Sequence, residues 1–166
     1  PTGGITFDNL ETYLRHHQVV ACGGSYMAPA AWLKNGNYTE IKEACRQAVD
    51  ISLGFELAHI GINCPDAVRA NQASGIISNI FRMTNKNGHS SVFAGSGVEF
   101  MKTMYYGGHG HIGFYTNSVF RALSYFRKQG FAVIQDSIKT DMHGELVSAY
   151  LEEQIEGFAL HIVRRS

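Results

Sequence analysis

The chain has little cysteine, little proline and no net charge. Its 166 residues include three cysteines and three prolines, and 14 Lys+Arg residues balance 14 Asp+Glu residues. Three scattered cysteines (Cys22, Cys45, Cys64) are too few for a disulfide framework or a zinc knuckle, and we interpret them as reduced thiols. The zero net charge gives no sign of a nucleic-acid partner or an anionic membrane surface. Neither a transmembrane-length apolar run nor a signal peptide is visible. The reduced cysteines lead us to expect a cytoplasmic protein.

What the chain does have is an internal repeat and enough apolar residues, 45%, to build a core. The triplet His-Ile-Gly occurs at 59–61 and again at 111–113. Each copy opens an apolar segment that ends at an Asn, Asn63 or Asn117, and each segment is followed by a helical pattern. A repeat of this period predicts two copies of one supersecondary unit. Two strands related in this way can direct two imidazoles at one point.

Residues 55–166 therefore predict two β-α-β-β-β modules in an α+β fold. Turn residues at Asn87-Gly88, Gly95 to Gly97 and His143-Gly144 separate the strands at hairpin spacing. In the first module we expect a strand at 56–64, a helix at 65–81 and strands at 82–84, 90–94 and 98–105. In the second we expect a strand at 109–117, a helix at 118–129 and strands near 131–136, 146–151 and 158–164.

Candidate metal ligands lie on the first and last strand of each module. Side chains alternate between the two faces of a strand, and in each of these strands one polar residue faces away from apolar neighbours. The set is His59, Glu99, His111 and His161. Three imidazoles and one carboxylate suit a divalent transition-metal ion such as Zn, Ni, Co, Mn or Fe. Gly61 and Gly113 lie on the same face and would leave room there for a small substrate.

Two simpler interpretations stay open for this set. The four residues are also compatible with ordinary half-buried polar positions in strands, or with a degenerate site that no longer holds a metal. We place the other histidines, His16, His17, His89, His109 and His143, in loops or at helix ends, exposed to solvent. Among these, His109 is the one able to replace His111 as a ligand.

The repeat resembles the vicinal oxygen chelate superfamily, which has the glyoxalase and bleomycin-resistance fold. The resemblance depends on the paired β-α-β-β-β units, the two His-Ile-Gly strand starts and Gly97-Val98-Glu99, and it covers about two thirds of the chain. It implies a metal in a cupped sheet, held by one residue from the first and last strand of each unit. Those positions are His59, Glu99, His111 and His161. The family more often has Glu at the last position, so His161 departs from its pattern.

Residues 1–53 lack the repeat and predict incomplete α/β structure. We expect a helix that starts at Asp8, a buried strand at 18–22 that ends at Gly23-Gly24-Ser25, and a second helix from Thr39. The second helix should direct Ile41, Cys45, Ala48 and Val49 inward. One strand and two helices cannot close a sheet. We therefore expect this part to be the tail of a larger α/β domain that packs against a neighbour.

The glycine motifs of this part resemble the end of the KDPG (2-keto-3-deoxy-6-phosphogluconate) and KHG (4-hydroxy-2-oxoglutarate) aldolases. The similarity lies in Pro-Thr-Gly-Gly-Ile at 1–5, about twenty residues of spacing, and Gly-Gly-Ser at 23–25 with the following Ala-Pro. It implies the last β/α units of a TIM barrel, whose backbone N–H groups bind phosphate. The implied substrate and phosphate-binding residues are Thr2, Gly3, Gly4, Gly24 and Ser25. The Schiff-base lysine of such aldolases lies earlier in the barrel, and Lys34 and Lys42 are interpreted as surface lysines.

Together these features predict the C-terminal portion of a KDPG/KHG-type class I aldolase (1–53) with an appended glyoxalase-like domain (55–166). The parent would be a lyase that cleaves a 2-keto-4-hydroxy acid to pyruvate and an aldehyde, and this chain would lack that activity. Alternatives are a metal-dependent glyoxalase- or dioxygenase-type enzyme and a non-catalytic small-molecule binding module. We expect a small keto acid or phosphorylated sugar acid as ligand, no organic cofactor, no nucleic-acid or membrane partner, and a homo-oligomer.

Overall fold

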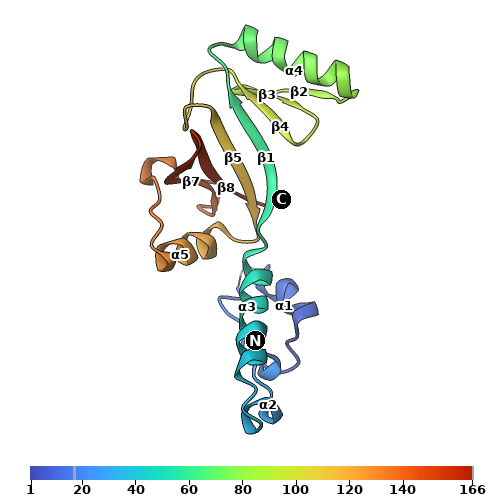
Figure 1. The fold of residues 1–166 in the computed structure, drawn as a ribbon, viewed down its shortest axis with the longest axis vertical. Coiled ribbons are helices and arrows are strands. Elements are labelled where there is room, and N and C mark those ends of the chain that lie inside the picture. The colour runs from blue at the N-terminus through green and yellow to red at the C-terminus, as the bar shows by residue number, and fades with distance from the viewer. Residues whose placement is uncertain (17, 166) are drawn as a thin grey trace. The chain divides into compact units, whose positions relative to one another are not determined.

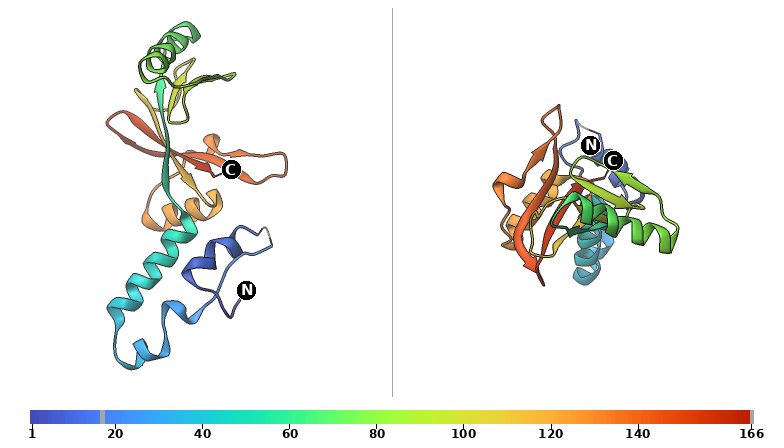
Figure 2. Two further views of the ribbon diagram at one scale, coloured as in Figure 1. Left: turned by 90° about the vertical axis from the view of Figure 1, so that its right-hand side faces the viewer. Right: turned by 90° about the horizontal axis from the view of Figure 1, so that it is seen from above.

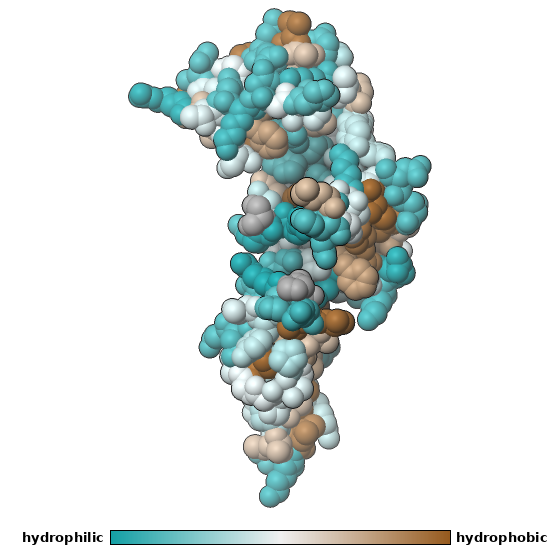
Figure 3. Space-filling view, turned by 180° about the vertical axis from the view of Figure 1, so that it is seen from behind, coloured by the Kyte–Doolittle hydropathy of each residue, from teal (hydrophilic) through white to brown (hydrophobic). Residues whose placement is uncertain are grey.

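The computed structural model describes residues 1–16 and 18–165 and divides into two compact units, Pro1–Phe55 and Glu56–Ser166. His17, expected in a loop, lies outside the described residues. Figure 1 labels the elements of both units, and Figure 2 gives two further views. Hydrophilic residues predominate on the face drawn in Figure 3, where apolar residues form small patches. No helix among the described residues is long and apolar enough to cross a bilayer.

Helices and irregular segments make up the described residues of the first unit. Its elements are α1 (Phe7–Leu14), the 3-10 helix η1 (Ser25–Met27), α2 (Ala30–Lys34) and α3 (Tyr38–Leu53). A small core joins them: Ile5, Leu10 and Ala48 are buried against Phe7, Leu14, Cys22, Tyr26, Met27 and Ile51. The predicted second helix is therefore present as α3, and α2 is an additional short helix that the sequence pattern did not indicate.

Three expectations for this unit are wrong. Residues 18–22 form no strand, because the described part of the unit offers no neighbouring strand for their N–H and C=O groups; Gly23 N instead donates to Pro1 O at 3.1 Å. On α3 the buried residues are Ala44, Ala48 and Leu53, whereas Cys45 and Val49 are exposed. α1 begins after Thr6, whose N–H donates to the Asn9 side chain at 2.8 Å, and not at Asp8.

The second unit consists of two β-α-β-β-β modules joined in one sheet. The first module contains β1 (Glu56–Asn63), α4 (Ala67–Phe81), β2 (Asn85–Asn87), β3 (Ser91–Ala94) and β4 (Val98–Met101). The second contains β5 (Gly110–Thr116), α5 (Val119–Gln129), a 3-10 turn η2 (Gln135–Ser137), β6 (Lys139–Thr140), β7 (Leu146–Ile155) and β8 (Phe158–Arg164). This confirms the α+β class with a mixed eight-stranded sheet, ordered β2-β3-β4-β1-β5-β8-β7-β6.

The sheet has a pseudo-symmetric centre. The first strands of the two modules, β1 and β5, pair antiparallel, and each also pairs in parallel with the last strand of its own module, β4 or β8. Figure 1 shows β1 and β5 side by side between the two outer groups of strands. α4 packs on β2, β3 and β4, and α5 packs on β7 and β8. This order puts the strands that carry the candidate ligands, β4, β1, β5 and β8, next to one another.

The helices of both modules begin at residues whose side chains cap them. Asp66 accepts a hydrogen bond from Arg69 N at 2.8 Å at the start of α4, and Ser118 accepts one from Arg121 N at 3.3 Å at the start of α5. These side chains satisfy backbone donors that a helix leaves free at its first turn. Each helix thus has a start signal in its own sequence.

Several strand boundaries differ from the expected ones. No strand covers 82–84: Arg82 ends α4 with a φ of 54°, and β2 starts at Asn85. β4 ends at Met101, short of residue 105. The strand expected at 131–136 is replaced by an isolated bridge at Val133 and by η2. In η2 the Ser137 hydroxyl accepts the Tyr150 N–H at 2.8 Å, so a side chain takes the place of a backbone partner.

Candidate metal centre

The register between β1 and β5 brings the two His-Ile-Gly triplets together. His59 is paired with Gly113, Ile60 with Ile112 and Gly61 with His111. Each imidazole therefore lies across from the glycine of the other triplet and on the same face of the sheet. The two Nε2 atoms are 3.0 Å apart. The sequence prediction that both histidines point at one place thus holds in the structure.

The two glycines have a different role from the one we expected. A Cβ atom on Gly61 would lie 2.5 Å from Nδ1 of His111 and closer still to two further ring atoms. A Cβ on Gly113 would lie 2.6–2.9 Å from the ring of His59. The space above each glycine is therefore filled by the imidazole of the opposite triplet, and it is not room for a substrate.

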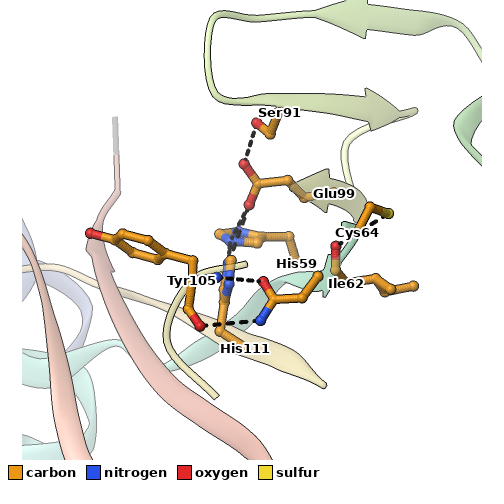
Figure 4. A network of polar contacts seen from close by, with 8 residues as sticks. His59, Ile62, Cys64, Ser91, Glu99, Tyr105 and His111 are labelled. Carbon is orange, nitrogen blue, oxygen red and sulfur yellow. Dashed lines mark hydrogen bonds and ion pairs between the residues drawn. The ribbon is translucent and has the colours of Figure 1, made fainter. Parts of the chain in front are cut away.

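Glu99 completes a triangle with the two histidines, as Figure 4 shows. Its Oε2 atom lies 3.4 Å from His59 Nε2 and 3.2 Å from His111 Nε2. The other carboxylate oxygen, Oε1, accepts a hydrogen bond from the Ser91 hydroxyl at 2.5 Å. Glu99 reaches this place because β4 pairs in parallel with β1, with Glu99 opposite Gly61.

His161 joins the cluster from β8, where it is paired with Gly113. One nitrogen from each of the three histidines, His59, His111 and His161, lies within 4.8 Å of the other two. His161 stacks on the Tyr150 ring, with centroids 4.3 Å apart and an angle of 6° between the planes. His111 is 1% exposed, so the cluster is largely shielded from water. All four residues of the predicted set are thus brought together.

The triangle of His59, His111 and Glu99 cannot be satisfied by protons alone. If both Nε2 atoms carry a proton and donate to Glu99, the two N–H groups face each other across 3.0 Å. If one Nε2–H donates to the other nitrogen, the accepting lone pair faces the Glu99 carboxylate across the remaining edge. Because an imidazole nitrogen either donates or accepts, at least one edge lacks a proton in either case. A cation between the three atoms would remove this repulsion.

Burial and charge set the protonation of the site. Burial lowers the pKa of His161 to about 3, with help from the other two histidines, and burial also lowers the pKa of His59. For Glu99 burial acts to raise the pKa, but hydrogen bonds from His111 and Ser91 and the charges of the two histidines outweigh it, so the net shift is downward. At neutral pH, His59 and His161 are therefore neutral and Glu99 is a carboxylate, the protonation states that metal ligands require.

The distances also fit an ion held by these residues. Two ligand atoms about 2.1 Å from a metal stand about 3.0 Å apart at a right angle and about 3.4 Å apart at a tetrahedral angle. The three edges of the triangle measure 3.0, 3.2 and 3.4 Å. Nδ1 of His111 and of His161 is buried without a hydrogen-bond partner among the described residues. These two rings are therefore oriented by packing on Tyr150, and not by the second hydrogen bond that commonly orients a metal-ligating histidine.

An aromatic wall that the sequence analysis missed stands beside the cluster. The ring centroids of Tyr105 and Tyr106 lie 5.7 and 4.6 Å from that of Tyr150. Asn63 holds the segment that carries them: its side-chain amide donates to Tyr105 O at 3.2 Å and to Gly107 O at 2.8 Å, and its Oδ1 accepts from Tyr105 N at 3.2 Å. The available signal was the position of Asn63 on the same strand face as His59 and Gly61.

The remaining candidates lie elsewhere. His109 bonds through Nδ1 to Glu156 O at 3.0 Å and takes no part in the cluster, so it does not replace His111. In the first unit Gly3 and Gly4 are exposed and have φ angles of 79° and 69°. A Cβ on Gly23 would lie 3.3 Å from the Thr2 side chain, so the segment at 1–2 adjoins the one that continues into Gly24 and Ser25. Lys34 and Lys42 are exposed, as expected for surface lysines.

Known proteins match the two parts of the chain separately. Residues 1–44 match the family model described as KDPG and KHG aldolase. The 2-dehydro-3-deoxy-phosphogluconate aldolase of Treponema pallidum (strain Nichols) is 41% identical over 51 residues, which cover 31% of this chain and 24% of that protein. The KHG/KDPG aldolase of Escherichia coli (strain K12) is 42% identical over 50 residues, 30% of this chain and 24% of that protein. The chain thus spans about a quarter of the length of the curated relatives it matches. The resemblance read from the glycine motifs is confirmed for residues 1–44.

About two thirds of the chain is similar in structure to solved proteins of low sequence identity. Methylmalonyl-CoA epimerase from Mycobacterium tuberculosis is 12% identical, with a TM-score of 0.47 over 66% of this chain and 87% of the other. Homoprotocatechuate 2,3-dioxygenase from Arthrobacter globiformis is 10% identical, with a TM-score of 0.42 over 66% of this chain and 36% of the other. Scores and identities at this level say nothing about the chemistry of the site.

Proposed function

We propose that residues 56–166 bind a divalent transition-metal ion through His59, Glu99, His111 and His161, and use it to bind a small oxygen-bearing molecule. The observation that carries the proposal is the triangle of His59 Nε2, His111 Nε2 and Glu99 Oε2, in which protons leave at least one edge unsatisfied. Buried polar atoms that repel one another are costly unless a partner compensates them. A divalent ion is the partner that two imidazoles and a carboxylate suit best.

The surrounding residues fit this role. A bound divalent ion would act as a Lewis acid that polarises an oxygen of the bound molecule. Neutral His59 and His161 offer lone pairs, and Ser91 holds the Glu99 carboxylate by donating to Oε1, which leaves Oε2 directed at the histidines. Burial raises the pKa of Tyr150, so its phenol keeps its proton at neutral pH and is able to donate a hydrogen bond.

Competition titration of the metal-stripped full chain with a chromophoric chelator tests the proposal. We expect Zn²⁺ or Co²⁺ to bind with micromolar or better affinity. We also expect His59→Ala, His111→Ala and Glu99→Ala each to weaken binding at least about tenfold, because each removes one ligand atom. His143→Ala, in an exposed turn, is the matched control and should bind like the unmutated chain. The proposal is wrong if the unmutated chain binds no ion, or if the three ligand variants bind as tightly as the control. The domain would then be a non-catalytic module that binds or supports without a metal.

For residues 1–53 we propose a second role, as the C-terminal β/α segment of a KDPG/KHG-type aldolase. The matches to residues 1–44 and to about 50 residues of the curated aldolases support it. So does the proximity of the two glycine motifs, joined by the bond from Gly23 N to Pro1 O. Thr2, Gly3, Gly4, Gly24 and Ser25 would then line a pocket for a keto acid or its phosphate group. The parent protein would be a lyase to which the metal-binding domain is appended.

A further inference from the structure

The metal centre has a lysine at its outer edge that plays no part in the proposed ligand set. Lys139 on β6 is paired with Ser148 on β7, and Tyr150, two residues further along β7, is paired with His161. Residues directly opposite one another in a sheet share a face, as do residues two apart on one strand. The register therefore puts Lys139 on the face of the sheet that carries His161 and the other candidate ligands.

Contacts between side chains connect Lys139 to the cluster. Its Nζ atom lies 5.8 Å from the centroid of the Tyr105 ring, and Tyr105 in turn contacts Tyr150, which stacks on His161. No carboxylate lies within ion-pair distance of Lys139 in residues 1–16 and 18–165. It is thus an exposed cation over an aromatic ring, without an acidic partner.

We infer that Lys139 is the anion anchor of the site and that the molecule bound there is a small carboxylate. The inference rests on the proposed metal site. A divalent ion and one Glu99 carboxylate leave one positive charge at the centre, and Lys139 adds a second at the edge, so an anion gains at both ends. Lysine acts on a carboxylate as a mobile point charge, which suits a position at the rim of a site. The rings of Tyr105 and Tyr150 connect Lys139 to His161.

Two soluble probes with the same keto-carbonyl core, one charged and one neutral, test the role of the charge. Pyruvate and methyl pyruvate both carry two neighbouring oxygens, but only pyruvate is an anion. We would load the full chain with Co²⁺ and follow the cobalt absorption bands during titration with each probe. The variants are Lys139→Met, Lys139→Arg and, as the matched control, Lys128→Met, which removes an exposed lysine from the last turn of α5.

We expect Lys139→Met to weaken pyruvate binding about fivefold, in line with an ion pair at a partly exposed site, and to leave methyl pyruvate unchanged. Lys139→Arg should keep most of the pyruvate affinity, and Lys128→Met all of it. Equal pyruvate affinity in Lys139→Met and Lys128→Met, with normal cobalt bands, would show that this inference alone is wrong. Absence of cobalt bands in the unmutated chain would instead overturn the proposed metal site, and the anion anchor with it.

Discussion

Gly61 is the position where a single methyl group should disrupt the site most directly. In Gly61→Ala the new Cβ would stand 2.5 Å from Nδ1 of His111 and still closer to Cε1 and Nε2. Real Cβ atoms do not approach other heavy atoms so closely, so either the ring or the strand must move. The ring is 1% exposed and is bounded by His59, Glu99 and Tyr150, which leaves it no free volume. We expect a loss of about 1–3 kcal/mol in the free energy of unfolding, the usual cost of overpacking a buried site.

Denaturant unfolding of the metal-free chain measures this loss, and the chelator competition measures what happens to metal affinity. A displaced His111 no longer offers Nε2 to the ion, so Gly61→Ala should also bind Co²⁺ at least about tenfold more weakly. Gly75→Ala is the control: Gly75 lies inside α4 with nothing within 4 Å of its Cβ position. That change should stabilise the chain by about 0.5–1 kcal/mol, because alanine favours a helix over glycine.

A double variant identifies the cause. Since the clash needs both partners, Gly61→Ala combined with His111→Ala should lose less stability than the sum of the two single changes, by about 0.5–3 kcal/mol. Unchanged stability and unchanged metal affinity in Gly61→Ala would refute the explanation given for the paired triplets. Strict additivity in the double variant would refute it as well.

Two further outcomes follow from the charges and from the chain's lysines. The metal-free chain should lose stability as the pH falls below 6.5. The reason is that His161 takes up a proton near pH 6.5 in the unfolded chain but only near pH 3 in the folded chain. The expected loss in the free energy of unfolding is about 2 kcal/mol between pH 8 and pH 5. Denaturant midpoints at the two pH values measure this loss. His161→Gln should reduce the loss, and His143→Gln should leave it unchanged. An equal loss in both variants would count against a buried neutral His161. Borohydride reduction in the presence of pyruvate should leave the mass of the chain unchanged, since Lys34 and Lys42 are exposed lysines; a mass increase that Lys34→Arg or Lys42→Arg abolishes would contradict this.

The sequence predicted correctly the parts of the fold in which the residue pattern along a strand agrees with the pairing of the strands. The His-Ile-Gly repeat predicted the two modules and the convergence of the four candidate ligands, because alternation along a strand and a two-module symmetry leave few other arrangements. The sequence pattern also predicted helices α4 and α5 close to their observed positions. The glycines of the repeat were interpreted wrongly, since only the cross-strand register shows that each lies beneath the opposite imidazole.

The errors share a physical cause, which is that the deciding partner lies far away in the sequence. Residues 18–22 are apolar enough for a strand, but the described residues of the first unit contain no strand to pair with them. The stretch 131–136 runs into η2, where the Ser137 hydroxyl, and not a backbone carbonyl, accepts the Tyr150 N–H. The aromatic wall was missed because Tyr105 and Tyr106 reach the site through the hydrogen bonds of Asn63 to a loop, which no periodicity reveals.

The most direct test of the metal centre is to locate the ion. Crystals of the full chain grown with CoCl₂ should give, at the cobalt absorption edge, one strong anomalous peak between the Nε2 atoms of His59 and His111 and the carboxylate of Glu99, with His161 beside it. The same crystals of His111→Ala should lose that peak. An anomalous map with no peak in this cluster, or with cobalt bound only at surface histidines such as His143, would contradict the central claim.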